Sequence, residues 1–588
     1  MSAKPDLRWQ LLLAGIAAVL VAFLLALSFL PSLAETTPLP ANNPTRIAAS
    51  GNNDENAPLC ETPASETALV PQVGGVVREG VVGAPRYLNP LLSDGNPIDE
   101  ELVSLLFDGL TRYDENGRLV GALAEGWQVS EDGLTVVFTL RPGLTWHDGE
   151  PVTAEDVAFT YGLLQASDFP DTAVADQALW QAVSINVLNE REISFTLPNA
   201  YAPFLAATTR GILPAHLLAS VPASSLANHP FNAVPVGTGP FMVGNNWQQA
   251  GELLLTPKPG AWPVPPYLDG LVVRFYADEE ALLAAYTAGE LDAVNRLSAT
   301  AVADALVLPN MRLYTTPRGR YAQLLFNLTE NGHPALDNLD VRLALTQALD
   351  KQAIIDTALT GQALPFEGPY LPQSFAYNPN LPATLPYNPD EANQRLDTAG
   401  WTMGETGPFR TGGEDGDVPL GLTLLAYNTP ANRALVEQIT EQWRAVGVEV
   451  FWSLTDDLST FQASLADRSF DVALVDVTPP GDPDLYDFWS QEAIVDGQNF
   501  AGWNRRRASE ALEAARQVWN QDERRAYYEA FLTFFDEDRP AVTLFQYVDN
   551  YGIHDGVQGV EIGEVQVPRD RYEQFAGWFL PDPTAVCE

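Results

Sequence analysis

The chain has 588 residues, of which 76 are acidic and 32 are basic, so its net charge is −44. A chain of this length is too long to fold around a single hydrophobic core, so we expect several domains. Hydrophobic residues make up 46% of it, which excludes a chain that is disordered throughout. A polyanion repels nucleic-acid phosphates and anionic lipid headgroups, so we expect no nucleic-acid partner. The acidity itself is typical of a solubilising surface, with a surface tuned to a cationic ligand as the alternative.

The first predicted element is an apolar segment near the N-terminus. Leu11 to Leu33 is nearly all apolar and about 23 residues long, which is enough to span a bilayer. Lys4 and Arg8 precede it, so a retained anchor has its N-terminus in the cytoplasm. A cleaved signal peptide is the alternative, because Ser32-Leu33-Ala34 has a small–x–small pattern, but the long apolar core favours the anchor. Both hypotheses place the rest of the chain outside the cytoplasm.

Residues 35–72 are predicted to be a disordered linker that follows the anchor or signal segment of residues 1–34. They are rich in Pro, Thr, Asn, Ala and Glu and have no periodicity. Cys60 in this linker and Cys587 near the C-terminus are the two cysteines. Outside the cytoplasm an even count favours a Cys60–Cys587 disulfide, and two unpaired thiols are the alternative. The cysteine and histidine spacings do not match those of metal ligands, so we expect no metal site and no cofactor.

The segment from Ala122 to Leu164 predicts a hairpin, a turn and a capped helix. Asp132-Gly133 is a strong hairpin signal between two β-rich runs. The second run alternates, which predicts one buried face made by Val136, Phe138 and Leu140. Thr153 is expected to cap the helix with Asp156, and its buried face is expected to carry Val157, Tyr161 and Leu164. His147 lies in the turn, where stabilising the turn is a more common role than binding a ligand.

The next elements are predicted from short apolar runs and breakers. Ala182 to Leu197 predicts two strands joined by Asn189-Glu190-Arg191. Gly237 and Gly239 resemble a phosphate loop at first sight, but no Lys-Ser/Thr follows and Pro240 stops a helix, so a turn into a strand is expected. Further on, Glu279–Ala288 predicts a helix closed by Gly289.

The C-terminal half predicts alternating strands and helices. Asp340 is expected to cap one long helix that ends at Gly361. Residues 422–454 predict a β-α-β unit with a parallel pair, and its helix is expected to bury Leu435, Ile439 and Trp443. The other expected elements are strands at 321–328, 470–477 and 541–548 and helices at 509–518 and 522–535.

Several segments in order resemble those of family 5 extracellular solute-binding proteins, the oligopeptide- and dipeptide-binding components of ABC importers. The 122–164 segment is similar to the family's signature. VGTGPF at 236–241 resembles the family's P-x-GTGPY segment, and YNPDEANQRLDTAGW at 387–401 resembles its Y-D-P run ending in A-G-[WY]. Four further segments resemble the family in the same order, at 286–294, 324–355, 482–490 and 499–505. Any one of these matches is weak, but their common order is specific.

The resemblance implies an α/β fold, a periplasmic-binding-protein-like clamshell of type II, cluster C, with an extra inserted domain. Lobe one is then discontinuous, and lobe two follows it. The implied bounds are 73–110, 185–308 and 541–588 for lobe one, 111–184 for the inserted domain and 309–540 for lobe two. Hinge closure of two such lobes around a ligand is a known mode of motion. The implied partners are a small solute, a peptide before a sugar, and ABC permease subunits, with the chain itself monomeric and held at the membrane by its N-terminal helix.

The resemblance also implies which residues contact ligand. The lobe-one loop corresponds to Ser93, Asp94, Gly95 and Asn96, and the lobe-two loop runs from Asp476 and Val477 to Asp482. Peptide binders of the family carry an Asp three or four residues before the loop's Pro, and it pairs with the peptide's α-amino group. Here Pro480 and Pro479 take those positions, which puts peptide ligands in doubt. Three aromatic residues that are candidates for stacking on a sugar are Tyr486, Trp489 and Trp503.

Three alternatives compete with a peptide-binding importer component. An enzyme is not expected, because no G-x-S-x-G, H-E-x-x-H or P-loop motif occurs and no carboxylate pair is marked out. A membrane-anchored sensor or interaction module with the same clamshell is the second alternative, and an oligosaccharide-binding member of the family is the third. The sequence favours importer-linked solute binding over all of these.

Overall fold

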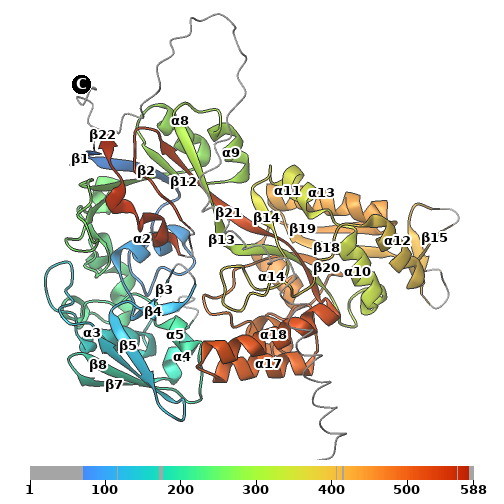
Figure 1. Cartoon of the computed structure of the whole chain (residues 1–588), viewed down its shortest axis with the longest axis horizontal. Coiled ribbons are helices and arrows are strands. Elements are labelled where there is room, and N and C mark those ends of the chain that lie inside the picture. Colours follow the sequence, from blue (N-terminus) through green and yellow to red (C-terminus); the bar gives the residue numbers. More distant parts are fainter. Residues whose placement is uncertain are drawn as a thin grey trace, which may run out of the picture. The chain divides into compact units, whose positions relative to one another are not determined.

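The computed structural model describes residues 71–581, apart from 115–116, 171–175, 405–406, 414–415, 417, 564 and 566 (Figure 1). The expected anchor at Leu11–Leu33, the linker and both Cys60 and Cys587 lie outside the described residues. Within the described ranges, the helices are all too short or too polar to cross a bilayer.

A mixed sheet dominates the described part of the chain, where it has 11 strands. Its order is β19-β18-β20-β13-β21-β12-β2-β11-β10-β9, and β14 pairs with β21. In that order the strands are β19 Glu449–Thr455, β18 Gly421–Tyr427, β20 Val472–Val477, β13 Met311–Phe326, β21 Ala541–His554, β12 Ala293–Leu297, β2 Val76–Val82, β11 Gly270–Tyr276, β10 Glu252–Pro257, β9 Phe241–Val243 and β14 Ala363–Pro365.

Two long strands, β13 and β21, connect the two ends of this sheet. They pair antiparallel from Met311↔His554 to Leu325↔Ala541, with a register shift between Pro317 and Tyr321. Before the shift, β21 also pairs with β12, and after it β13 pairs with β20. Both strands are therefore longer than the 321–328 and 541–548 runs expected from the sequence, because each has a partner on either side of the shift.

The parallel end of the sheet confirms the predicted β-α-β unit. β18 and β19 pair in parallel, and α13 (Pro430–Ala445) connects them. α14 (Leu458–Ala466) then leads from β19 to β20, which pairs with β18 on its other side. The three expected residues of α13 are buried, namely Leu435, Ile439 and Trp443.

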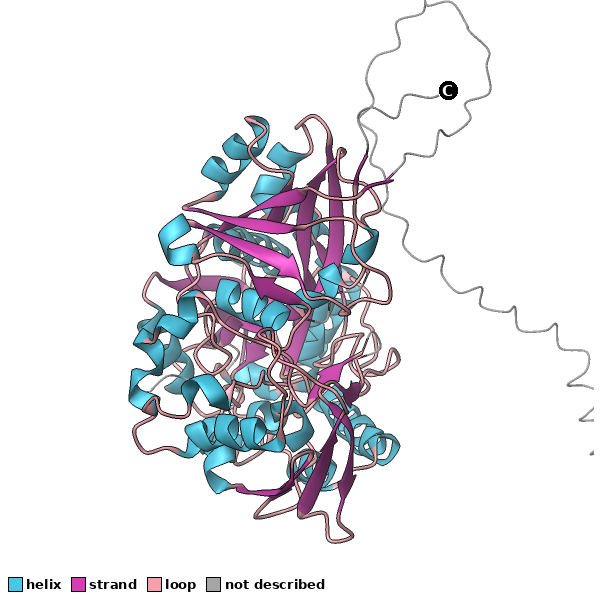
Figure 2. Ribbon diagram, turned by 90° about the vertical axis from the view of Figure 1, so that its left-hand side faces the viewer, coloured by secondary structure: helices cyan, strands magenta, loops and turns pink. Residues whose placement is uncertain are grey.

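Helices flank the strands of the structure (Figure 2), and different helices contribute to the cores on the two faces of this region. Leu324 packs in one core with α13, α10 (Leu339–Gln347) and α11 (Lys351–Ala358). Leu325, the next residue of β13, packs in another core with α17 (Arg506–Gln517) and α18 (Gln521–Asp538). This is the alternation that a strand buried on both faces requires.

The prediction of a single long helix between Asp340 and Gly361 is wrong. The structure has two helices, α10 and α11, and Asn338 rather than Asp340 caps the first. Asp350 interrupts the run and caps α11 by accepting from the Ala353 amide at 3.0 Å. The apolar spacing continued across the break, so periodicity alone did not reveal it.

A separate antiparallel sheet, β5-β6-β8-β7, confirms the predicted hairpins. Val136, Phe138 and Leu140 are fully buried, and Gly133 has a positive φ of 71° in the hairpin turn. α3 (Ala154–Gln165) begins at the expected capping box, in which the Thr153 amide donates to Asp156 at 2.8 Å. The strands are β5 Ala124–Val129, β6 Thr135–Leu140, β8 Glu192–Thr196 and β7 Ser184–Asn189.

The remaining elements are short or lie beside the main sheet. The ladder of β1 (Pro71–Gln72) with β22 (Leu580–Pro581) brings the two ends of the described chain together, while the disulfide stays a prediction. The other strands are β3 Thr111–Tyr113, β4 Leu119–Gly121, β15 Thr402–Met403, β16 Arg410–Gly412 and β17 Val418–Pro419. The other α-helices are α2 Pro97–Leu106, α4 Gln177–Ala182, α5 Phe204–Ala207, α6 Ala215–Leu218, α7 Trp247–Ala250, α8 Glu279–Thr287, α9 Ala299–Ala305, α12 Pro389–Thr398, α15 Tyr486–Trp489 and α16 Ala493–Asp496. The 3-10 helices are η1 Ala223–Asn228, η2 Pro230–Ala233, η3 Pro334–Asp337, η4 Pro568–Tyr572 and η5 Phe575–Gly577.

Candidate functional site

A cavity of about 800 Å³ lies at the carboxyl ends of β18 and β20. Its walls come from β13, β18, β20 and β21, from the first turns of α13 and α14, and from the loops that follow β20. The lining includes Arg318, Arg320, Gln323, Leu458, Phe461, Asp476, Val477, Phe488, Trp489, Phe500 and Tyr547.

The topology explains why a cavity forms at this place. α13 leaves the end of β18 and packs on one face of the sheet, whereas α15 follows β20 and its Trp489 packs in the core on the other face. The chain therefore turns in opposite directions at the carboxyl ends of adjacent parallel strands. Ligands of open α/β sheets bind at such switch points, because the diverging connections leave a crevice there.

The charged wall of the cavity is built by three adjacent strands. Asp476 on β20 accepts a hydrogen bond from the Tyr547 hydroxyl of β21 at 2.7 Å. Its other carboxylate oxygen pairs with the Arg320 guanidinium of β13, which lies 5.3 Å from the Tyr547 ring centre. Burial raises the pKa of the Tyr547 phenol, and the Asp476 charge raises it further, so this hydroxyl stays a donor. Both oxygens of Asp476 are thus occupied by protein partners.

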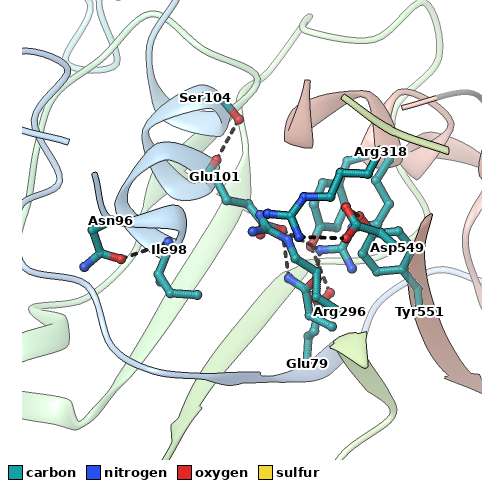
Figure 3. Close-up of polar contacts among 12 residues, drawn as sticks. Glu79, Asn96, Ile98, Glu101, Ser104, Arg296, Arg318, Asp549 and Tyr551 are labelled. Carbon is teal, nitrogen blue, oxygen red and sulfur yellow. Dashed lines mark hydrogen bonds and ion pairs between the residues drawn. The ribbon is translucent and has the colours of Figure 1, made fainter. Parts of the chain in front are cut away.

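Arg318 lies beside this group, at the register shift of β13. Figure 3 shows its side chain meeting Asp549, and Arg318 Nη1 is 3.6 Å from Asp549 Oδ1. Nearby, Glu101 of α2 pairs with Arg296 of β12. Arg571 of η4 binds Glu101 at 2.8 Å and Glu79 of β2 at 2.6 Å, so it connects α2 with the sheet.

The remaining wall of the cavity combines apolar side chains with the polar residues Gln323, Thr429, Asn432, Gln462 and Gln498. Phe461 and Leu458 come from α14, and Phe488 and Phe500 come from the segments after β20. Gln323 of β13 is only 3% exposed, and within the described residues its Oε1 accepts no hydrogen bond. The cavity therefore combines an apolar surface, a charged end and an unsatisfied buried amide oxygen.

Some of the residues proposed from the sequence line this cavity, and others do not. Asp476, Val477 and Trp489 are in the lining. Tyr486 lies outside it, with its ring 3.9 Å from the Arg516 guanidinium carbon. Trp503 is 3% exposed and donates from Nε1 to Asp538 Oδ2 at 2.9 Å, so in this structure it is a core residue without a free face for a sugar.

The carboxylate of Asp482 is paired with a buried side chain of the protein and does not line the cavity. It is 3% exposed and accepts from Arg524 Nη1 at 2.7 Å and from Arg524 Nη2 at 2.5 Å. The Tyr528 hydroxyl accepts a further bond from the same guanidinium, at 2.6 Å. This pairing clamps the loop after β20 to α18.

The proposed lobe-one loop from Ser93 to Asn96 does not line the cavity. Asp94 binds Arg210 through Oδ1 at 3.1 Å and through Oδ2 at 3.0 Å. Asn96 caps α2 by accepting from the Ile98 amide at 3.0 Å. Both side chains have local partners, so a role in ligand contact stays a prediction for this loop.

The residues that sequence reasoning missed are Arg318, Arg320, Gln323, Phe461 and Tyr547. One signal was present: two arginines flank Gly319 directly before an apolar strand, in a chain with few basic residues. For Phe461, α14 itself was not predicted. Among the described residues, no group of three or more His, Cys, Asp or Glu side chains lies close enough together to hold a metal ion.

A second, smaller cavity of about 200 Å³ lies between residues 113–205 and residues 375–524. Direct hydrogen bonds join the same two segments. The Ala202 amide donates to the Arg516 carbonyl at 2.7 Å, and Trp519 Nε1 donates to the Gly133 carbonyl at 3.2 Å. The corner between α17 and α18 thus contacts the β5–β6 hairpin.

Comparison with known proteins agrees with this architecture. The oligopeptide-binding protein AppA of Bacillus subtilis is 26% identical over 540 residues, covering 90% of this chain and 95% of AppA. The structure of AppA in complex with a nonapeptide superposes on this structure with a TM-score of 0.63 and 24% sequence identity. The superposition covers 87% of this chain and 100% of the AppA chain. The substrate-binding protein CtaP of Listeria monocytogenes superposes with a TM-score of 0.72 at 20% identity, with 87% and 100% coverage.

The structural likenesses establish the α/β periplasmic-binding-protein fold of this group. A sequence model of one family covers residues 118–494, which is more than half of the chain. The chain therefore belongs to the bacterial extracellular solute-binding proteins, family 5.

Proposed function

We propose that this protein captures a peptide or a similar small solute outside the cytoplasm and delivers it to an ABC permease. The observation that carries the proposal is the cavity of about 800 Å³ at the switch point of β18 and β20, in a chain of this family. The relation to AppA, an oligopeptide-binding protein, supports a peptide-like solute. The family consists of binding proteins, so the chain is a carrier of solute and not an enzyme.

The proposed mechanism is closure of two lobes. Lobe one comprises 73–110, 185–308 and 541–588, lobe two comprises 309–540, and the inserted domain comprises 111–184. Strand β13 begins lobe two and β21 begins the last segment of lobe one, and the register shift between these paired strands near Pro317 supports a hinge there. Ligand favours the closed state only by the contacts that it gains on closure.

The proposed location is the outer face of the cell membrane. The apolar N-terminal segment supports an anchor, because it is long enough to span a bilayer and follows two basic residues. The proposed partners are the solute and the permease subunits, and the chain itself is monomeric. Asp476, Val477 and Trp489 are the proposed ligand-contacting residues that line the cavity.

A thermal-shift screen of the full chain tests the proposal. We expect the melting temperature to rise with the concentration of a di- to hexapeptide, because a ligand at 100 times its Kd stabilises the native state by about 2.7 kcal/mol. Oligosaccharides are the comparison series. A rise with oligosaccharides alone, or with neither series, contradicts the peptide assignment.

A pair of matched variants locates the site. Phe461→Glu places a charge on the apolar wall of the cavity, and we expect it to abolish the shift. Phe451→Glu is the control, because Phe451 is 52% exposed on β19 and lies outside the cavity. An equal loss in both variants places the ligand elsewhere.

A further inference from the structure

The balance of acidic and basic residues around the cavity differs from the balance in the chain as a whole. The whole chain has 76 acidic and 32 basic residues. The lining contains two arginines, Arg318 and Arg320, and one acidic residue, Asp476. The lining is therefore net positive by one charge in a strongly negative protein, which favours an anionic group in the ligand.

The single acidic residue of the lining already has two protein partners. Asp476 is held by the Tyr547 hydroxyl at 2.7 Å and by the Arg320 guanidinium. An ammonium group entering the cavity therefore competes with two protein donors, and the Arg320 charge offsets the attraction of the carboxylate.

Arg318 is the group with unused hydrogen-bonding capacity. Within the described residues its guanidinium donates no hydrogen bond, and its ionic partner, Asp549, lies 3.6 Å away. The side chain is 38% exposed, so it is accessible from the cavity. A guanidinium offers a planar fork of donors that matches the two oxygens of a carboxylate.

Two further features favour a ligand that carries both a carboxylate and an N–H group. Gln323 is buried, lines the same cavity, and has an Oε1 without a donor among the described residues. Such an unsatisfied acceptor costs free energy unless a ligand donor satisfies it. The first turn of α13, which contributes Ala431 and Asn432 to the wall, adds the positive end of a helix of 16 residues.

The apolar wall indicates the rest of the ligand. Phe461, Phe488 and Phe500 line it, and Leu458 is 52% exposed at its edge. An exposed leucine beside three aromatic rings gains from being covered by an apolar group.

From these observations we propose that the cavity selects acylated or otherwise amine-blocked amino acids and short peptides that carry a free carboxylate and an apolar side chain. The carboxylate accepts hydrogen bonds from Arg318, an amide N–H of the ligand donates to Gln323 Oε1, and the apolar side chain packs on Phe461. The inference rests on the proposed function, since it names the class of solute for the same cavity.

Calorimetric titration of the full chain tests the proposal with four probes. These are N-acetyl-Leu-Phe, its C-terminal amide, unblocked Leu-Phe and phenyl phosphate. We expect N-acetyl-Leu-Phe to bind about tenfold to hundredfold more tightly than its amide, the range for a charge-assisted hydrogen bond. Phenyl phosphate tests whether any anion suffices.

Variants assign the effect to Arg318. Arg318→Gln should remove the preference for the acid over the amide, and Arg318→Lys should keep part of it, because the charge remains without the fork. Arg506→Gln is the control, since that side chain is 81% exposed on α17, and it should leave the preference unchanged.

Each result has a separate meaning. Equal binding of the acid and the amide, or tighter binding of unblocked Leu-Phe alone, overturns the inference and leaves the proposed function standing. Binding of phenyl phosphate alone replaces the carboxylate by a phosphate and overturns it too. If none of the peptide probes binds and the thermal-shift screen finds no peptide, both the inference and the peptide assignment fail.

Discussion

At the scale of single residues, His147 shows how a side chain in a turn acquires a structural role. Its Nδ1 accepts from the Gly237 amide at 3.0 Å, which leaves Nε2 to donate to the Gly239 carbonyl at 3.0 Å. Burial lowers the pKa of this imidazole to about 4. The ring is therefore neutral at pH 7, and it connects its own turn at 146–150 with the Gly237–Gly239 segment, which confirms the turn-stabilising role and the turn expected at that segment.

The pH dependence of stability follows from that lowered pKa. Below the unfolded pKa of about 6.5 the unfolded chain binds a proton that the native ring does not, so stability present at neutral pH is lost as the pH falls towards 4. We expect His147→Ala to lower the unfolding free energy at pH 7.5, and this difference to shrink by about 2 kcal/mol at pH 4.5. Urea unfolding at both pH values measures it. A difference that does not change with pH contradicts the assignment.

At the scale of elements, buried charges attach loops to helices. The loop after β20 is held to α18 by Asp482 and Arg524, whose side chains are 3% and 6% exposed. Arg524 Nε also donates to the Ala515 carbonyl of α17 at 3.0 Å. One guanidinium therefore connects this loop with both helices.

Removal of one partner should be costly at this position. We expect Asp482→Ala to lower the unfolding free energy by about 3–5 kcal/mol, because it leaves Arg524 buried without a counter-charge. Asp476→Ala is the matched comparison, and we expect about 1 kcal/mol, since its side chain is 24% exposed. Urea unfolding of the two variants measures both values. Equal losses would show that Asp482 has no special structural role.

At the scale of the whole molecule, contacts far apart in the sequence support the closed arrangement that we propose. Trp519, after α17, donates to Gly133 in the β5–β6 turn, and the Ala202 amide donates to the Arg516 carbonyl. Such contacts contribute to closure if they are lost on opening.

We expect Trp519→Ala to weaken solute binding about fivefold, because the closed state loses a hydrogen bond and its packing. Small-angle scattering of the ligand-free variant should show a larger radius of gyration. Trp452→Ala is the control, as Trp452 is 41% exposed on β19 and away from this contact. An unchanged affinity and radius for Trp519→Ala means that the contact does not contribute to closure.

Local patterns predicted much of the fold correctly. The hairpin at Asp132-Gly133, the capping box of Thr153 and the parallel β-α-β unit depend on residues close together in the chain, so their signals are complete within a short window. The prediction of one helix failed at α10 and α11, because the apolar spacing continues across Asp350, which caps α11.

The sequence by itself determined the family, through ordered motifs, and most of the elements. Only the tertiary structure decided the site. Arg320 and Asp476 are 156 residues apart, yet β13 and β20 are adjacent in the sheet. Asp482, a candidate by position, is neutralised by Arg524, 42 residues away. Whether a charge is free for a ligand depends on such distant partners, and a linear motif does not contain that information.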